Sequence, residues 1–355
     1  MSTSAAPTYD SSLVIDYPAR DMTITVKAEM PCSLLQQILR QEGQTLPIDA
    51  ASEQTTVGEL VLQDHCGPRQ FGYGTLRDYV IGVAAVDGFE RLFHAGGRVV
   101  KNVAGYDLCK LLIGSNGTLA IITQVTLKLR PKPETSALVG LTFESVKQVE
   151  ALLARLMSSA TRPVAIDVLN PQATLNSLPR SPSQTFLLCV GYEGADREVR
   201  WQIETMLAEA RAFEPRSAKT LIGSGAEPAW TELTDFAISG EMPTARSPLT
   251  FKASLLPSKT MEFLQLATES GISAKAHAGN GIVLGHLPSR VTTSAQAEPV
   301  LQPLSVLASS CRGSMSMLRV SSDWPIAMRR AGSSAGHDWS ERIQRQLDPL
   351  GLFRE

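Results

Sequence analysis

Two groups of glycines around one short apolar segment constrain the fold of this chain more than any other feature. They stand on both sides of the segment 108–113, at Gly96, Gly97, Gly105, Gly114 and Gly117. Because glycine has no Cβ, its backbone N–H groups can closely approach an anionic group or a planar ring, and a helix start adds a favourable dipole. The spacing therefore indicates a cofactor-binding loop. Tight turns around buried strands explain the same glycines equally well, and spacing alone does not separate the two.

The composition is that of an ordinary globular protein with a sizeable core. The chain has 355 residues, of which 43% are hydrophobic and 19% charged, and this size predicts two domains. The 33 Lys and Arg residues balance 35 Asp and Glu residues, without a long run of one charge. This balance excludes the basic surface of a nucleic-acid-binding protein, so we expect a small-molecule or protein partner.

The cysteines and the apolar segments restrict the metal content and the location. The five cysteines are all more than 30 residues apart, which excludes short-spaced zinc or iron–sulfur ligands, and we expect buried thiols and no metal. Residues 1–12 lack the basic start and apolar core of a signal peptide. No segment approaches the roughly 20 apolar residues of a membrane span, so we predict a cytoplasmic protein.

A proline-rich stretch, Arg130-Pro131-Lys132-Pro133-Glu134, marks the predicted domain boundary. Its prolines remove two backbone donors and favour extended geometry, as in a linker. We therefore predict a first domain over 1–131 and a second over 132–337, followed by a short helix and tail over 338–355.

Hydrophobic periodicity predicts strands and helices on both sides of this linker. Residues 22–28 alternate as in a half-buried strand, and a helix follows with a capping box at Ser33 and Gln36 and a left-handed residue at Gly43. The stretches 174–184 and 289–299 are polar and predict surface loops. In the second domain we predict strands at 138–143, 164–169, 186–190, 250–255 and 282–287, with helices at 146–156, 199–210 and 259–269.

The glycine-rich region closely resembles a known flavoprotein signature. The run Gly96–Pro131 reads GGRVVKNVAGYDLCKLLIGSNGTLAIITQVTLKLRP. It is similar, without gaps, to the KN-x-x-GYD and GS-x-GTL elements of the FAD-binding subunits of bacterial glycolate oxidase, which are vanillyl-alcohol-oxidase-like flavoproteins of the PCMH type. Upstream, Gly67-Pro68-Arg69 and Tyr73-Gly74-Thr75-Leu76-Arg77-Asp78 resemble the SGPR and YG-x-x-RD elements of this family.

The resemblance implies the fold class, the cofactor and a set of site residues. The expected fold is α+β, with an N-terminally shortened PCMH-type FAD-binding domain and an α+β cap domain that contains an antiparallel sheet. The implied cofactor is FAD. For each site residue a purely structural role is the alternative. The residues implied to lie on or near FAD are Gly67, Arg69, Tyr73, Gly74, Asp78, Lys101, Asn102, Gly105, Tyr106, Asp107, Gly114, Ser115, Gly117, Thr118, Ile121 and Ile122.

Two departures from the family pattern bear on cofactor binding. The family has a Gly-rich phosphate loop about fifty residues before the part that corresponds to Val14–Pro18, and this sequence starts too late to contain it. In addition, Glu59 stands at a position where the family has glycine. If Glu59 faces the diphosphate, the repulsion at ~4 Å amounts to about 4 kcal/mol at an effective dielectric constant near 20, before screening.

A second motif, His277-Ala278-Gly279-Asn280-Gly281, resembles the HAGNG element of the family, in which the histidine faces the flavin. In one interpretation His277 is a catalytic residue that accepts the hydroxyl proton of a 2-hydroxy acid. In the other, Gly279-Asn280-Gly281 is a hairpin turn and His277 only ends a strand. Both interpretations stay open at this point.

The resemblance implies an FAD-binding subunit of a glycolate-oxidase-type complex that supports oxidation of a small 2-hydroxy acid, glycolate or D-lactate. It also implies two partners, a second flavoprotein subunit and an iron–sulfur subunit, through which the complex would lie at the inner membrane. One alternative is a non-catalytic structural subunit that has lost tight FAD binding. Another is an incomplete gene sequence, with the phosphate loop encoded upstream.

Overall fold

The computed structural model describes residues 11–353 except 51, 53, 66, 98–106, 174, 179–183, 238–240, 243–244 and 326–336. The chain divides into two compact units. Unit 1 comprises Met1–Gly67, Tyr73–Lys132 and Ala335–Glu355, and unit 2 comprises Pro68–Gly72 and Pro133–Ser334. Unit 2 thus contains a short segment of the N-terminal half of the sequence.

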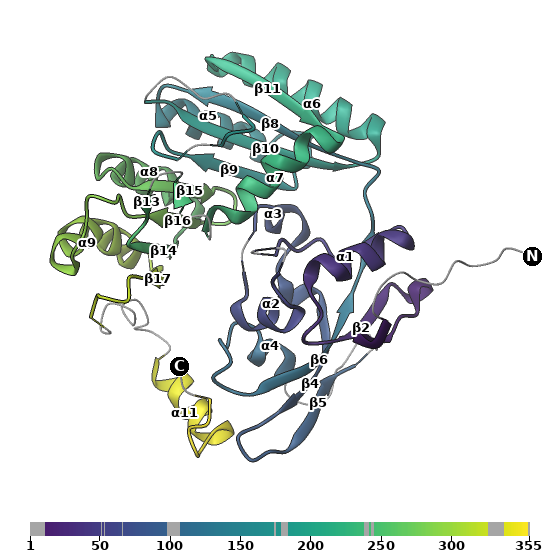
Figure 1. The fold of residues 1–355 in the computed structure, drawn as a ribbon. Helices are drawn as coiled ribbons and strands as arrows, with labels where there is room; N and C mark the ends of the chain where they lie inside the picture. Colours follow the sequence, from purple (N-terminus) through teal and green to yellow (C-terminus); the bar gives the residue numbers. More distant parts are fainter. Residues whose placement is uncertain are drawn as a thin grey trace, which may run out of the picture. The chain divides into compact units, whose positions relative to one another are not determined.

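A five-stranded antiparallel sheet with the order β1-β2-β6-β4-β5 organises unit 1 (Figure 1). The alternating residues of its central strands, among them Ile24, Val26, Val125 and Leu127, share one buried cluster with the apolar faces of the first, second and fourth helices. The elements are β1 (Val14–Asp16), β2 (Thr23–Lys27), α1 (Cys32–Gln41), β3 (Gln44–Thr45), α2 (Val57–Gln63), η3 (Leu76–Asp78), β4 (Val80–Val86), β5 (Leu92–Gly96), α4 (Leu108–Leu112), β6 (Ile121–Lys128), β7 (Arg130–Pro131) and α11 (His337–Leu347). Helix α3 (Gln70–Tyr73) begins in unit 2 and ends at the first residue of the next unit 1 segment.

The strand and helix predicted after residue 22 are confirmed, but the predicted cap is wrong. The N-cap of α1 is Pro31, which makes no side-chain hydrogen bond. The Gln36 amide instead donates to the carbonyl of Leu46 at 2.6 Å, on the strand side of the helix. Gly43 adopts the expected left-handed conformation, with φ of 64°.

Unit 2 is built on an eight-stranded antiparallel sheet with the order β11-β8-β10-β9-β15-β16-β14-β17, which the antiparallel cap-domain prediction anticipated (Figure 1). All the strands and helices predicted in this region are present. The elements are β8 (Thr135–Phe143), α5 (Val146–Met157), β9 (Ala165–Leu169), β10 (Phe186–Gly194), α6 (Asp196–Ala210), β11 (Ser217–Ile222), α7 (Glu227–Thr234), η6 (Asp235–Ala237), β12 (Glu241–Met242), β13 (Ala245–Arg246), β14 (Leu249–Ser254), α8 (Thr260–Glu269), β15 (Ser273–His277), β16 (Ile282–His286), α9 (Ser294–Ser310) and β17 (Ser314–Val320).

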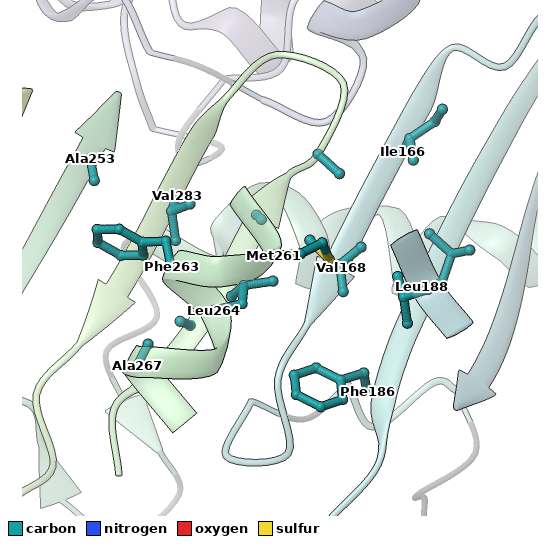
Figure 2. Packing of buried hydrophobic residues seen from close by; sticks show 14 of the residues in the cluster. Ile166, Val168, Phe186, Leu188, Ala253, Met261, Phe263, Leu264, Ala267 and Val283 are labelled. Atoms are coloured by element: carbon teal, nitrogen blue, oxygen red, sulfur yellow. The ribbon is translucent and has the colours of Figure 1, made fainter. Parts of the chain in front are cut away.

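The two faces of this sheet differ in chemistry because side chains alternate along each strand. One face carries Ile166, Val168 and Ala276 into a single core cluster with helices α5, α6, α8 and α9. Figure 2 shows Met261 and Leu264 of α8 within this cluster. The other face carries the residues between them, Asp167 on β9 and His277 on β15, and it receives α7.

The loop predicted over 289–299 is only partly correct, because α9 begins at Ser294 and continues through Pro299 and Pro303. A proline inside a helix removes one backbone hydrogen bond and strains the preceding turn. Here Leu301 and Leu304 are buried in the core of unit 2, and this packing outweighs the local preference.

The C-terminal segment belongs to unit 1. Ile343 and Leu347 of α11 pack against the unit 1 core, and the Gly88 N–H donates to the Leu347 carbonyl at 2.9 Å. The Asp348 carboxylate accepts hydrogen bonds from the backbone N–H groups of Leu352 and Phe353, both at 2.8 Å. These bonds fix the end of the tail next to the β4–β5 hairpin.

We predict that Phe263→Ala lowers the free energy of unfolding by about 3–5 kcal/mol, because Phe263 is fully buried within the α8 core contact (Figure 2). The matched control is Phe89→Ala, since Phe89 is 50% exposed. Its loss should cost less than about 1 kcal/mol. Urea denaturation followed by circular dichroism measures the free energy of unfolding of both variants. Equal losses in the two variants would contradict the placement of Phe263 in the core.

Candidate functional site

The glycine loop of unit 1 is held against the end of α2. Gly114 and Gly117 have φ of 77° and 76°, a backbone region in which other residues are strained. The Gly114 N–H donates to the Val61 carbonyl at 3.0 Å, and the Asn116 N–H donates to the Leu62 carbonyl at 2.9 Å. The glycines therefore let the chain turn closely over α2.

The backbone N–H groups of this loop are largely used within the protein. Besides those of Gly114 and Asn116, the Ser115 N–H donates to Leu112 at 3.2 Å and the Thr118 N–H to Ser115 at 3.0 Å. The Thr118 hydroxyl also donates to the Ser115 carbonyl, at 2.7 Å. The sequence predicted that such N–H groups would face an anion, but these four have partners in the chain.

The Ser115 hydroxyl is a polar group of the loop that lacks a partner in the described part of the chain. Its Oγ is buried and has no hydrogen-bond partner among the described residues. A buried polar atom without a partner costs about 1–3 kcal/mol, which a polar group of a ligand would recover. Among the described residues, an added Cβ at Gly117 would meet only the Leu62 side chain, at 3.9 Å. This loop thus fits a ligand through Ser115.

Asp107 begins α4. Its carboxylate caps the helix by accepting from the Lys110 N–H at 3.2 Å, and it also pairs with Lys110 Nζ at 3.1 Å. Burial favours the neutral acid, but the hydrogen bonds and charge of Lys110 outweigh it and lower the pKa of Asp107. Lys101, Asn102, Gly105 and Tyr106, the other predicted residues of this motif, lie outside the described residues.

Most of the upstream motif has local structural partners. An added Cβ at Gly67 would lie 2.4 Å from the Asp49 carboxylate, and one at Gly74 would lie 2.6 Å from that of Asp78. Asp78 accepts from the Thr75 N–H at 2.8 Å and thereby caps η3. Gly74 and Asp78 therefore form one turn.

Arg69 and Tyr73 lie in different units. Within unit 2, Arg69 Nε donates to Glu193 Oε1 at 2.8 Å, and the guanidinium lies 3.9 Å from the centre of the Trp230 ring. Within unit 1, the Tyr73 ring lies 5.3 Å from the Arg130 guanidinium. Both predicted cofactor residues thus make protein contacts that explain their presence.

The last two predicted residues of the flavin motif begin β6 and face opposite sides of the sheet. Ile122 is buried in the unit 1 core, whereas the Ile121 side chain is 56% exposed. Of the pair, Ile121 is the one with a surface left for a ligand or a partner.

Glu59 does not face inward. It is exposed and lies in the first turn of α2, where its carboxylate accepts from the Thr56 N–H at 2.9 Å while the Thr56 hydroxyl accepts from the Glu59 N–H at 3.2 Å. This is a complete capping box. The adjacent Gly58 is needed for packing, since an added Cβ would lie 2.9 Å from the Ala28 Cβ. The condition for repulsion of a diphosphate, an inward Glu59 carboxylate, is therefore not met.

His277 lies at the end of β15 in unit 2, and a turn with Gly281 at φ of 73° follows it, as the hairpin interpretation predicts. The histidine is 2% exposed. Its Nδ1 lies 2.7 Å from Asp167 Oδ1, and its Nε2 is buried without a hydrogen-bond partner among the described residues. One ring nitrogen of His277 therefore has no hydrogen bond within the described chain.

The sequence analysis missed two residues of this group, Asp167 and Lys275. The Lys275 ammonium is fully buried, 3.6 Å from Asp167 Oδ2, donates to the Leu233 carbonyl and lies 5.6 Å from the centre of the Phe236 ring. Burial alone would raise the pKa of Asp167, but the charges and hydrogen bonds of His277 and Lys275 outweigh it and lower that pKa. Charged residues inside the apolar strands AIDVL and SAKAH were the available signal.

His286 has a structural role. Its Nδ1 lies 3.0 Å from the Thr250 hydroxyl, and its Nε2 is hydrogen-bonded to the Phe236 carbonyl. Burial lowers the pKa of His286. Both ring nitrogens have partners, which separates this histidine from His277.

Neither a metal site nor a membrane span is found in the described part of the chain. There, no group of three or more His, Cys, Asp or Glu side chains is arranged to hold a metal ion. None of the described helices is long and apolar enough to cross a membrane.

The sequence is similar to FAD-dependent oxidoreductases. The FAD binding domain family matches residues 10–96. Glycolate oxidase subunit GlcE of Escherichia coli (strain K12) is 34% identical over 125 residues, which are 35% of this chain and 36% of that protein. Glycolate oxidase subunit GlcD of Bacillus subtilis (strain 168) is 27% identical over 217 residues, which are 58% of this chain and 46% of that protein. The matches thus span less than half of these relatives.

The fold is similar to that of a solved synthase structure. An alkyldihydroxyacetonephosphate synthase structure matches with a TM-score of 0.64, covering 96% of this chain and 64% of that chain at 17% sequence identity. At this identity the likeness concerns the fold alone. The chain therefore shares the α+β architecture of this structure, and its residues 10–96 match the FAD binding domain family.

We predict that Glu59→Gln changes the FAD dissociation constant by less than about twofold, because the exposed carboxylate is screened and glutamine preserves the capping box. Glu59→Gly should leave the affinity equally unchanged and lower the free energy of unfolding by about 1 kcal/mol, through loss of the cap. Flavin fluorescence titration and thermal denaturation measure the two effects. Tighter FAD binding by both variants would show that the charge does repel the diphosphate.

Proposed function

We propose that this chain, whose residues 10–96 belong to the FAD binding domain family of the PCMH type, is the FAD-binding subunit of a glycolate-oxidase-type complex. The complex would oxidise a small 2-hydroxy acid, glycolate or D-lactate, to the 2-oxo acid. The observation that carries the proposal is His277, whose buried Nε2 has no hydrogen-bond partner among the described residues while its Nδ1 faces a carboxylate. This is the arrangement of a proton acceptor for a hydroxyl group.

We propose a cofactor contact in unit 1 and a proton acceptor in unit 2. Ser115 is proposed to contact FAD in unit 1. His277 is proposed to accept the hydroxyl proton in unit 2. FAD, when bound, supplies the acceptor for the hydride that leaves the carbon bearing this hydroxyl.

The proposed partners are a second flavoprotein subunit and an iron–sulfur subunit. We propose that the chain lies in the cytoplasm and is held at the inner membrane through these subunits. The support is that two relatives carry the names of glycolate oxidase subunits. A further relative, a D-lactate dehydrogenase of Archaeoglobus fulgidus, is 36% identical over 107 residues, which are 30% of this chain and 24% of that protein. These names support 2-hydroxy acids as the substrate class.

A second candidate function is a structural subunit without tight FAD binding. It is favoured by the glycine loop, in which the N–H groups of Gly114, Ser115, Asn116 and Thr118 bond to carbonyls of the chain. It is also favoured by Arg69, which pairs with Glu193 in unit 2. In this case the family motifs would persist because they pack the protein.

We expect the complex, assembled by co-expression with both partner subunits, to reduce a dye acceptor with glycolate or D-lactate. His277→Asn should lower kcat by about 10²- to 10⁴-fold, the usual contribution of a general base. The matched control is His94→Gln, because His94 is exposed on β5 of unit 1. Full activity of the His277 variant would refute the catalytic assignment, and inactivity of the wild-type complex with every 2-hydroxy acid would refute the proposed function.

We expect the purified chain, mixed with FAD and then dialysed, to keep a flavin absorption spectrum. Ser115→Ala should weaken FAD binding by about 2- to 12-fold, the equivalent of one ordinary hydrogen bond. Ser310→Ala, a change at an exposed position of unit 2, is the control. A wild-type chain that retains no flavin, alone or in the complex, would instead support the structural subunit.

A further inference from the structure

The sheet of unit 2 places Asp167, Lys275 and His277 close together on the face that receives α7. Asp167 of β9 is paired with Cys189 of β10 on one side and with His277 of β15 on the other. Lys275 lies two residues before His277, so its side chain projects from the same face. The residues between them, such as Val168 and Ala276, belong to the core on the opposite face. The strand register thus gathers these charges in an otherwise apolar sheet.

The Asp167 carboxylate lies between a hydrogen bond from His277 and an ion pair with Lys275, and its Oδ2 makes no hydrogen bond among the described residues. Its Oδ1 lies 2.7 Å from His277 Nδ1, and its Oδ2 lies 3.6 Å from Lys275 Nζ. Asp167 is 1% exposed and Lys275 is fully buried. Lys275 is itself fixed by the Leu233 carbonyl at the end of α7. The position of the carboxylate is therefore determined from both sides.

An ionised carboxylate accepts hydrogen bonds and donates none, so the proton between Asp167 and His277 belongs to Nδ1. In the neutral imidazole the other nitrogen, Nε2, is then an acceptor. Nε2 is also the nitrogen of His277 that is buried without a partner among the described residues. The nitrogen that this tautomer leaves as an acceptor is thus the same nitrogen that has no partner among the described residues.

We propose that Asp167 is a positioning residue that holds His277 as the Nδ1–H tautomer, with Lys275 keeping the carboxylate ionised and oriented, so that Nε2 accepts the hydroxyl proton of the substrate. This role rests on the proposed function for its substrate, a small 2-hydroxy acid. The hydroxyl O–H bond breaks and an Nε2–H bond forms, while the hydrogen on the carbon leaves with its electron pair to the flavin and a carbonyl remains. The Nδ1–H bond to Asp167 stabilises the charge that His277 gains.

The tautomer can be observed directly, without activity. In chains labelled with ¹⁵N-histidine, two-bond ¹H–¹⁵N correlation spectra distinguish the two ring nitrogens, and His277→Asn assigns the signal. We expect the neutral wild-type ring to carry its proton on Nδ1. A wild-type ring protonated on Nε2 would overturn the proposal, and this measurement requires no variant of Asp167 to fold.

Asp167→Asn makes the opposite prediction. Next to Lys275, the amide should turn its oxygen toward the ammonium and its NH₂ toward Nδ1, which makes Nδ1 the acceptor and moves the proton to Nε2. Glu209→Gln is the control, because Glu209 is a largely buried carboxylate of α6 that pairs with Arg155, outside the His277 contact. It should leave the tautomer unchanged. An unchanged tautomer in a folded Asp167→Asn variant would overturn the proposal.

The assembled complex gives a second readout. Asp167→Asn should lower kcat by about 10²- to 10⁴-fold, as expected when a general base has the wrong tautomer, with KM changed by less than about threefold. Glu209→Gln should retain activity. Retained activity in the Asp167→Asn complex would overturn the role of Asp167. A wild-type complex that oxidises no 2-hydroxy acid would refute the proposed function, and the tautomer spectra would still decide whether Asp167 positions His277.

Discussion

The buried carboxylate of Asp167 is the constraint on which the polar face of unit 2 depends. A carboxylate that is 1% exposed is costly unless it is paired and hydrogen-bonded. Lys275 and His277 provide both, and their effect on the pKa of Asp167 is larger than that of burial. Lys275 in turn anchors the end of α7 through the Leu233 carbonyl. The Asp167 carboxylate therefore links strands β9 and β15 and, through Lys275, helix α7. It also contacts the ring of His277, whose Nε2 has no hydrogen-bond partner among the described residues.

In unit 1 the flavin motif has a different physical basis from the one its glycines first indicate. The positive φ of Gly114 and Gly117 allows the loop to fold over α2, and the loop N–H groups bond to carbonyls of the same chain. Asp78 and Asp107 each cap a helix. Packing and capping thus account for positions at which the family resemblance implies cofactor contacts. Within the motif, Ser115 differs, because its buried hydroxyl has no hydrogen-bond partner among the described residues.

Periodicity predicted five of the eight strands of the large sheet of unit 2 and the helices α5, α6 and α8, because these elements are regular. The strands and helices from Thr135 to Leu169 and from Phe186 to Ala210 follow apolar periods of two and of 3.6 residues. Local rules failed where tertiary packing overrides them, as in α9, which contains Pro299 and Pro303. The capping box expected at Ser33 failed because Gln36 bonds to Leu46 instead, a contact that requires the fold. The site was less predictable, since Asp167 and His277 are 110 residues apart and meet only through strand register.

Two of the buried atoms without a hydrogen-bond partner in the described part of the chain, Ser115 Oγ and His277 Nε2, belong to motifs that resemble those of the flavoprotein family. A protein that only retained its packing would gain stability by giving a buried Ser115 Oγ or His277 Nε2 a partner, or by replacing it with an apolar group. Arg69 has such partners in Glu193 and Trp230, and Glu59 has one in its own helix cap. Ser115 and His277 have no partner for these atoms in the described chain, one in each unit. Other buried polar atoms also lack a partner among the described residues, for example Thr23 Oγ1 in unit 1 and Gln172 Oε1 in unit 2. The missing partner therefore points to a ligand only together with the family motifs in which Ser115 and His277 stand.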